Sequence, residues 1–177
     1  MTIKFAIITC SDTRTLETDE AGAKLEELIA AEGWECIRRV VEKDERPFIA
    51  GALLDACDHT DADVVLTCGG SGLSLRDVTP EATRDVADRE VPGIAEAMRV
   101  HSLKITPYAM LSRAICAQRG RTLIINLPGS TKAATENWEG IVAALPHAVK
   151  MMAGGGHDTQ KDLSEKLSAA AARGELG

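Results

Sequence analysis

Apolar and polar positions follow one another in blocks along the chain. Four runs bounded by polar residues read as strands: 3–9, 35–41, 62–68 and 121–127. The first, third and fourth are largely apolar, which is typical of strands covered on both faces of a sheet, and 35–41 (ECIRRVV) is a further strand candidate. Between the first three runs, residues 19–31 and 46–57 carry apolar side chains at helical spacing. A strand, helix, strand, helix, strand order predicts βαβ units with right-handed crossovers. We therefore expect an α/β fold, a three-layer sandwich around a mostly parallel central sheet.

The second half of the chain predicts further helices after Pro92 and from about Thr131. Thr79, Pro80 and Glu81 read as an N-cap, a proline at the first helical position and an acid in the first turn. Residues 108–115 read as a helix with one polar face. Glycines from position 154 end the pattern, so we expect one domain over 1–153 and a tail over 154–177, helical or partly disordered.

Composition excludes several classes of protein. The net charge of −7 argues against general nucleic-acid binding, which needs a basic face, but is compatible with a local pocket for an anionic small molecule. The five cysteines form no CxxC pair, and no histidine joins them at a zinc-like spacing, so we expect reduced thiols. The first ten residues read as a strand rather than a signal peptide, and no apolar run reaches 18 residues. We expect a cytoplasmic protein without a membrane span.

Polar loops follow all four strand candidates. They are CSDTR at 10–14, EKDER at 42–46, CGGSGLSLRD at 68–77 and LPGSTK at 127–132. Ligands of open α/β sheets bind beyond the carboxyl ends of the strands, where these loops should meet. The sequence therefore predicts a ligand site at that edge.

The third of these loops is rich in glycine. Gly69, Gly70 and Gly72 remove Cβ atoms around Ser71, so that backbone N–H groups can approach an anion closely. The spacing is neither GxGxxG nor a Walker A loop, and a tight turn alone is an equal alternative.

Charged residues lie in or beside the same loops. Asp12, Asp44 and Asp77 each follow a strand, and carboxylates beside a phosphate-binding loop suit Mg²⁺, although each could be a surface acid or a helix-capping partner. Three cations could neutralise phosphate or could be solvated surface charges: Arg76, Arg113 and Lys132.

The fourth loop, from Pro128 to Lys132, combines Gly129 and hydroxyl groups before a helix, whose free N–H groups favour anions. Ser130 or Thr131 could also serve only as the N-cap. No histidine stands near Ser112 in the sequence, so a serine-hydrolase triad has no support.

Together these motifs resemble one family. LTCGGSGLSLRDVTPEAT at 66–83 resembles the LTxGGTGxxxRDxTPEA signature of the molybdopterin-binding MogA/MoaB family, with Ser71 in place of the usual threonine. LSRA at 111–114, NLPGSTKA at 126–133, and Ser11 and Asp12 near the start also fit. VADREVPGIAEAMR at 86–99 resembles the MogA type, the molybdopterin adenylyltransferases.

The resemblance implies a parallel α/β fold and a homotrimer. It also implies an enzyme that uses Mg-ATP to adenylate the terminal phosphate of molybdopterin, releasing pyrophosphate and passing the product to a downstream molybdenum-insertion enzyme. By position, Asp44 and Asp77 match the aspartates associated with activity, so we expect them to be catalytic and to bind Mg²⁺. The other matching or neighbouring residues expected to bind substrate are Ser11, Asp12, Gly69, Gly70, Ser71, Gly72, Arg76, Ser112, Arg113, Pro128, Gly129, Ser130 and Lys132.

Three alternatives stay open at this stage. The chain could be a MoaB-like molybdopterin-binding protein with little or no adenylyltransferase activity, a non-catalytic binding module, or a nucleotide-binding regulator indifferent to pterin. The presence of both Asp44 and Asp77 favours the enzyme.

Overall fold

A computed structural model describes residues 2–154. A six-stranded sheet with strand order β2-β1-β3-β6-β5-β4 lies at its centre. The four strands expected from the sequence are present and mutually parallel: β1 (Lys4–Cys10), β2 (Glu35–Glu42), β3 (Val64–Cys68) and β6 (Thr122–Leu127). The predicted α/β sandwich with a mostly parallel sheet is confirmed.

Two short strands at one edge were not predicted. β5 (Cys116–Arg119) pairs antiparallel with β6, and β4 (Arg89–Glu90) pairs antiparallel with β5. Gly120, with a φ of 54°, forms the turn between β5 and β6. Strands of four and two residues are too short for an apolar pattern to reveal them.

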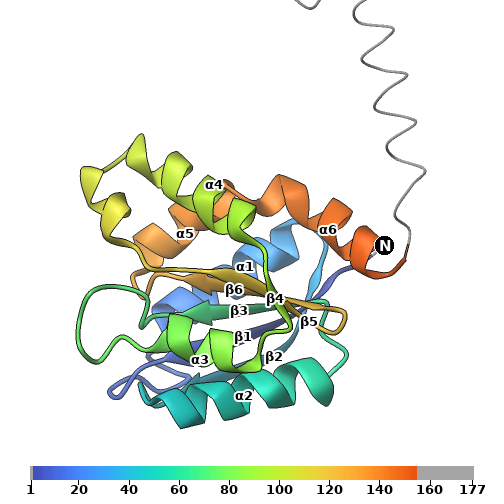
Figure 1. The fold of residues 1–177 in the computed structure, drawn as a ribbon, viewed down its shortest axis with the longest axis horizontal. Helices are drawn as coiled ribbons and strands as arrows, with labels where there is room; N and C mark the ends of the chain where they lie inside the picture. Colours follow the sequence, from blue (N-terminus) through green and yellow to red (C-terminus); the bar gives the residue numbers. More distant parts are fainter. Residues whose placement is uncertain (1, 155–177) are drawn as a thin grey trace, which may run out of the picture.

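Helices cover both faces of the sheet, so the molecule has three layers (Figure 1). One face carries α1 (Glu20–Ala31), α4 (Pro92–Leu103), α5 (Thr131–Glu139) and α6 (Leu145–Met152). The other carries α2 (Arg46–Asp58) and α3 (Thr79–Val86). Two 3₁₀ segments, η1 (Pro107–Leu111) and η2 (Val142–Ala144), complete the described elements.

The core consists of two apolar clusters, one on each face of the sheet. Phe5 of β1 is fully buried on the first face and stacks on Trp34, with ring centroids 5.6 Å apart. Trp138 of α5 packs against both rings. The next residue of β1, Ala6, points to the other face, as strand alternation requires. Aliphatic side chains form most of both clusters, as the low aromatic content predicts.

A buried polar network ties the sheet to α3. Asn126 of β6 is fully buried, and its Nδ2 donates to the Thr67 hydroxyl at 3.0 Å and to the Thr83 hydroxyl at 2.9 Å. Its Oδ1 accepts from the Ile115 amide at 3.3 Å. These three bonds fix the end of β6, and so the loop after it, relative to β3 and α3.

Two expectations about local structure were wrong. Thr79 is not the N-cap of α3, because the helix begins at Thr79 itself, after Val78. Residues 108–115 do not form an α-helix: η1 spans Pro107–Leu111, Ser112 has an extended φ/ψ, and the chain continues into β5. Proline at the start of η1 fixes φ but supplies no N–H, and the five-residue segment buries no side chain that would stabilise a longer helix.

The predicted tail over 154–177 lies outside the described residues, apart from Gly154, and the domain boundary at 153 stays a prediction. Among the described helices, none combines the length and apolar character needed to cross a bilayer.

Candidate functional site

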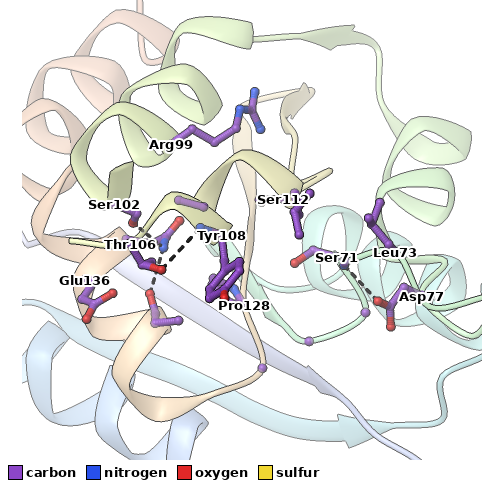
Figure 2. A pocket seen from close by; sticks show the side chains of 18 residues that line it. Ser71, Leu73, Asp77, Arg99, Ser102, Thr106, Tyr108, Ser112, Pro128 and Glu136 are labelled. Carbon is purple, nitrogen blue, oxygen red and sulfur yellow. Dashed lines mark hydrogen bonds between the residues drawn. The ribbon is translucent and has the colours of Figure 1, made fainter. Parts of the chain in front are cut away.

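A cavity of about 560 Å³ opens at the carboxyl ends of β3 and β6 (Figure 2). The glycine-rich loop after β3 and the loop after β6 form one side of the cavity, and α4, η1 and α5 form the other. Of the residues expected to bind ligand, those lining it are Gly69, Gly70, Ser71, Gly72, Asp77, Ser112, Pro128 and Gly129. Those that do not are Ser11, Asp12, Asp44, Arg76, Arg113, Ser130 and Lys132.

The glycines of the loop are required by close contacts and by backbone conformation. Gly69 and Gly70 have φ values of 105° and 67°, in the region that side chains disfavour. A Cβ on Gly69 would lie 2.7 Å from the Cys10 carbonyl oxygen. A Cβ on Gly129 would lie 3.2 Å from the Gly69 Cα, so the loops after β3 and β6 pack backbone against backbone.

Thr79 fixes the start of this loop from beneath. Its buried hydroxyl donates to the Gly69 carbonyl at 2.9 Å, and its amide donates to the Gly70 carbonyl at 3.0 Å. Within residues 2–154, the amides of Gly70 and Ser71 donate to no acceptor. The Gly69 and Gly70 carbonyls are thus occupied by Thr79, whereas the Gly70 and Ser71 amides remain available as N–H donors to an anionic ligand.

Asp77 closes the other end of the loop. Its Oδ2 accepts from the Gly72 amide at 3.0 Å and from the Ser74 amide at 3.2 Å. Oδ1 accepts from no donor in the described part of the chain, so one oxygen holds the loop and the other stays available beside the cavity.

Asp44 lies on the opposite side of the loop. Its Oδ1 is 3.4 Å from the position that a Cβ on Gly70 would take. That oxygen is buried and has no hydrogen-bond partner among residues 2–154. Burial raises the pKa of the Asp44 carboxyl, and the neighbouring charges of Asp12 and Asp77 raise this pKa further. An unsatisfied carboxylate oxygen near two other carboxylates is a place where a cation would be favourable.

These carboxylates fit a magnesium ion held partly by substrate. Within the described ranges, no three histidine, cysteine, aspartate or glutamate side chains converge closely enough to hold a metal by themselves. Mg²⁺ characteristically takes one or two protein carboxylates together with phosphate oxygens and water. Asp44 and Asp77 meet that description.

Asp12 and Ser11 organise the loop after β1. Asp12 forms an ion pair with Arg76, and the hydrogen bond from Arg76 lowers the pKa of the Asp12 carboxyl. Its Oδ1 also accepts from the Asp44 amide at 3.2 Å. Ser11 Oγ accepts from the Arg14 amide at 3.2 Å, and the Arg14 guanidinium donates to the Gly129 carbonyl at 2.9 Å. These contacts connect all four polar loops.

Ser130 is the N-cap of α5, its Oγ accepting from the Ala133 amide at 3.2 Å. The Lys132 side chain is 83% exposed, and its Nζ lies 3.9 Å from Glu136 Oε1. Arg113 lies behind the glycine loop, where its guanidinium is bonded to protein acceptors.

Sequence reasoning missed much of the cavity wall. Polar residues that line it and were not predicted are Arg99, Ser102, Thr106, Tyr108, Glu136 and Asn137. They come from the ends of α4, η1 and α5, where polar side chains in a helical pattern read as solvated faces. Of these residues, Arg99 alone had a signal in the sequence, because it is the last residue of the segment 86–99 that resembles the MogA type.

The fold and the cavity define an α/β protein with a cavity at the carboxyl edge of a mostly parallel sheet, lined by a glycine loop that has aspartates beside it. Residues 6–147 match the family described as "Probable molybdopterin binding domain". The chain belongs to this family, and the predicted membership of the MogA/MoaB group is confirmed.

The similar proteins carry two kinds of name. A protein named molybdopterin adenylyltransferase from Helicobacter pylori strain 26695 is 37% identical over 157 residues, which cover 86% of this chain and 89% of that one. Molybdenum cofactor biosynthesis protein B from Halalkalibacterium halodurans is 42% identical, with coverage of 75% and 79%. The Drosophila melanogaster molybdenum cofactor synthesis protein cinnamon is 42% identical over 85% of this chain, which spans only 26% of that longer protein.

Solved structures agree with the sequence comparisons. The molybdopterin biosynthesis enzyme MoaB from Thermus thermophilus superposes with a TM-score of 0.80 at 42% identity, covering 86% of this chain and 98% of that one. A structure of MogA superposes with a TM-score of 0.79 at 34% identity, with coverage of 84% and 99%.

Proposed function

We propose that this protein is a molybdopterin adenylyltransferase of molybdenum cofactor biosynthesis, which uses Mg-ATP to form adenylyl-molybdopterin and pyrophosphate. The observation that carries the proposal is that Asp44 and Asp77 flank one glycine loop whose Gly70 and Ser71 amides have no acceptor in the described part of the chain. Relatives named molybdopterin adenylyltransferase, at 37% to 45% identity, support it.

In this proposal the loop amides hold phosphate oxygens, and Asp44 and Asp77 hold Mg²⁺. When bound, Mg²⁺ would neutralise charge on the triphosphate and help to align the attacking phosphate oxygen of molybdopterin. The residues of this chain contribute by holding the loop in position. Thr79 and Asp77 hold the loop carbonyls and amides in place, so the remaining donors need no reorganisation when an anion arrives.

A second candidate is a MoaB-like protein that binds molybdopterin with little or no turnover. Relatives named molybdenum cofactor biosynthesis protein B are as similar, at 41% and 42% identity, and favour keeping it. The two functions differ in the product, so product analysis separates them.

The decisive experiment incubates the purified protein with molybdopterin and Mg-ATP and follows adenylyl-molybdopterin by mass. Asp44→Asn and Asp77→Asn should each retain substrate binding and lose turnover, whereas Asp61→Asn, at a carboxylate that is 91% exposed and paired with Lys4, should behave as wild type. Binding without product would favour the MoaB-like function, and failure to bind molybdopterin would refute both.

We also propose an oligomeric state and a cellular location for the protein. Exposed apolar side chains on α4, on η1 and between them, including Val100, Ile105, Tyr108 and Met110, support a homotrimer. The five free cysteines support a cytoplasmic location, where a downstream molybdenum-insertion enzyme would take the product. Light scattering on the purified protein tests the trimer, and a monomer at micromolar concentration would contradict it.

A further inference from the structure

Arg113 is bonded to the back of the glycine loop. Its Nε donates to the Gly72 carbonyl at 2.7 Å, and its Nη2 donates to the Asp77 carbonyl at 2.7 Å. Its own amide donates to the Ser71 carbonyl at 2.9 Å. One residue therefore bonds three backbone oxygens within residues 71–77.

Glu81 of α3 holds the same guanidinium from the other side. Arg113 Nη1 lies 2.5 Å from Glu81 Oε1, and Nη2 lies 3.4 Å from Oε2. The hydrogen bond from Arg113 is also the main cause that lowers the pKa of the Glu81 carboxyl. Four of the five N–H donors of a guanidinium are thus committed to protein acceptors.

Arg113 is the one residue outside this segment that bonds its backbone within residues 2–154. Every such hydrogen bond from outside 71–77 in that range comes from Arg113. The side chains at the tip give no packing support, since Leu75 is fully exposed and Leu73 is 64% exposed. The Asp77 carboxylate bonds only amides of its own segment, so it moves with the segment.

We propose that Arg113, clamped by Glu81, is a positioning residue that sets where the Asp77 carboxylate stands, and that it is not a phosphate ligand. The expected effect of Arg113 on turnover rests on the proposed function. The clamp itself is a property of the protein without substrate. Lysine cannot replace this arginine, because an ammonium group cannot reach carbonyls and a carboxylate in a planar fork.

The first test is hydrogen exchange of the substrate-free protein. Arg113→Lys should speed exchange of the Gly72, Ser74 and Asp77 amides roughly tenfold or more, as expected for lost hydrogen bonds to a charged group, and leave β3 and β6 unchanged. Arg46→Lys is the matched control, because Arg46 pairs with Asp85 on the surface away from the cavity. Glu81→Gln, which keeps both carbonyl bonds, should give a smaller increase at the same amides. Unchanged loop exchange in Arg113→Lys would overturn the inference.

The second test is steady-state kinetics in the adenylation assay. Arg113→Lys should lower kcat at least tenfold with little change in the KM for ATP. A raised KM with unchanged kcat would instead indicate a phosphate ligand and overturn the inference. If the wild type forms no product, the proposed function fails, whereas the exchange experiment still decides whether the clamp exists.

Discussion

The Gly70→Ala substitution gives the sharpest test of how the loop is built. Gly70 adopts a φ of 67°, and an added Cβ would lie 2.3 Å from the Thr79 hydroxyl oxygen and 3.4 Å from Asp44 Oδ1. The Thr79 side chain is fully buried, so it cannot rotate away from the new methyl group without leaving its bond to Gly69.

The size of the effect follows from two contributions. A non-glycine residue in the left-handed region costs about 1–2 kcal/mol, and losing the Thr79–Gly69 hydrogen bond costs about 1 kcal/mol. Reduced freedom of the unfolded chain offsets less than about 1 kcal/mol. We expect a net loss of about 2 kcal/mol in the free energy of unfolding, which lowers Tm by roughly 4–8 °C for a domain of this size.

Thermal and urea unfolding followed by circular dichroism measure this loss, with Gly51→Ala as the matched control. Gly51 lies within α2, its φ is not positive, and nothing lies within 4 Å of an added Cβ. Alanine there should be neutral or stabilise by up to about 1 kcal/mol. If Gly70→Ala unfolds within 0.5 °C of wild type, or if both variants lose equal stability, the proposed contacts of the loop are wrong.

Three further outcomes are expected. Asp44→Asn should raise the free energy of unfolding near pH 7 by about 1 kcal/mol, because it removes a partly buried charge with an unsatisfied oxygen. Because the pKa of this carboxyl is raised in the folded protein, only its ionised form destabilises the fold. Urea unfolding should therefore show that the gain disappears below the pKa of the carboxyl in the unfolded chain. Asn126→Ala should cost about 2–4 kcal/mol by breaking the buried network, measured by urea unfolding. Cys10, Cys68 and Cys116, whose thiol pKa values burial raises to about 12, should react with an alkylating reagent at pH 8 only after denaturation, as mass spectrometry will report.

Most of the parallel part of the sheet was predictable because β1, β3 and β6 are covered on both faces. Such strands need apolar residues at nearly every position, and β3 and β6 are buried throughout, so their runs stand out in the sequence. β4 and β5 were not predictable. β4 is exposed and β5 is buried only in its first two residues. What makes them strands is the pairing of β5 with β6 across the turn at Gly120 and of β4 with β5.

The candidate site was also predictable only in part. Glycines, aspartates and prolines in loops carry local meaning, so the loop from Gly69 to Asp77 was found from the sequence. The wall formed by Ser102, Glu136 and Asn137 depends on how α4 and α5 pack together. Asn137 Nδ2 donates to the Ser102 hydroxyl across 35 positions at 3.1 Å, a contact that no local pattern contains. Arg113 was read as a phosphate ligand for the same reason, because its partners Gly72, Asp77 and Glu81 lie more than 30 positions away.

These contacts engage the acceptors of the glycine loop and leave some of its donors unbonded. The carbonyls of Gly69 to Gly72 are bonded, by Thr79 at one end and Arg113 at the other, while Asp77 bonds the amides of Gly72 and Ser74. Within residues 2–154, the amides of Gly70 and Ser71, which lie between these anchors, have no acceptor. A loop with its acceptors satisfied and its donors unsatisfied binds anions whatever the identity of the pterin or nucleotide. The two carboxylates beside it would repel that anion, so an anion and a cation must bind there together or both bind weakly. Phosphate and Mg²⁺ should therefore each raise the affinity of the protein for the other, and titration calorimetry showing independent binding would contradict this coupling.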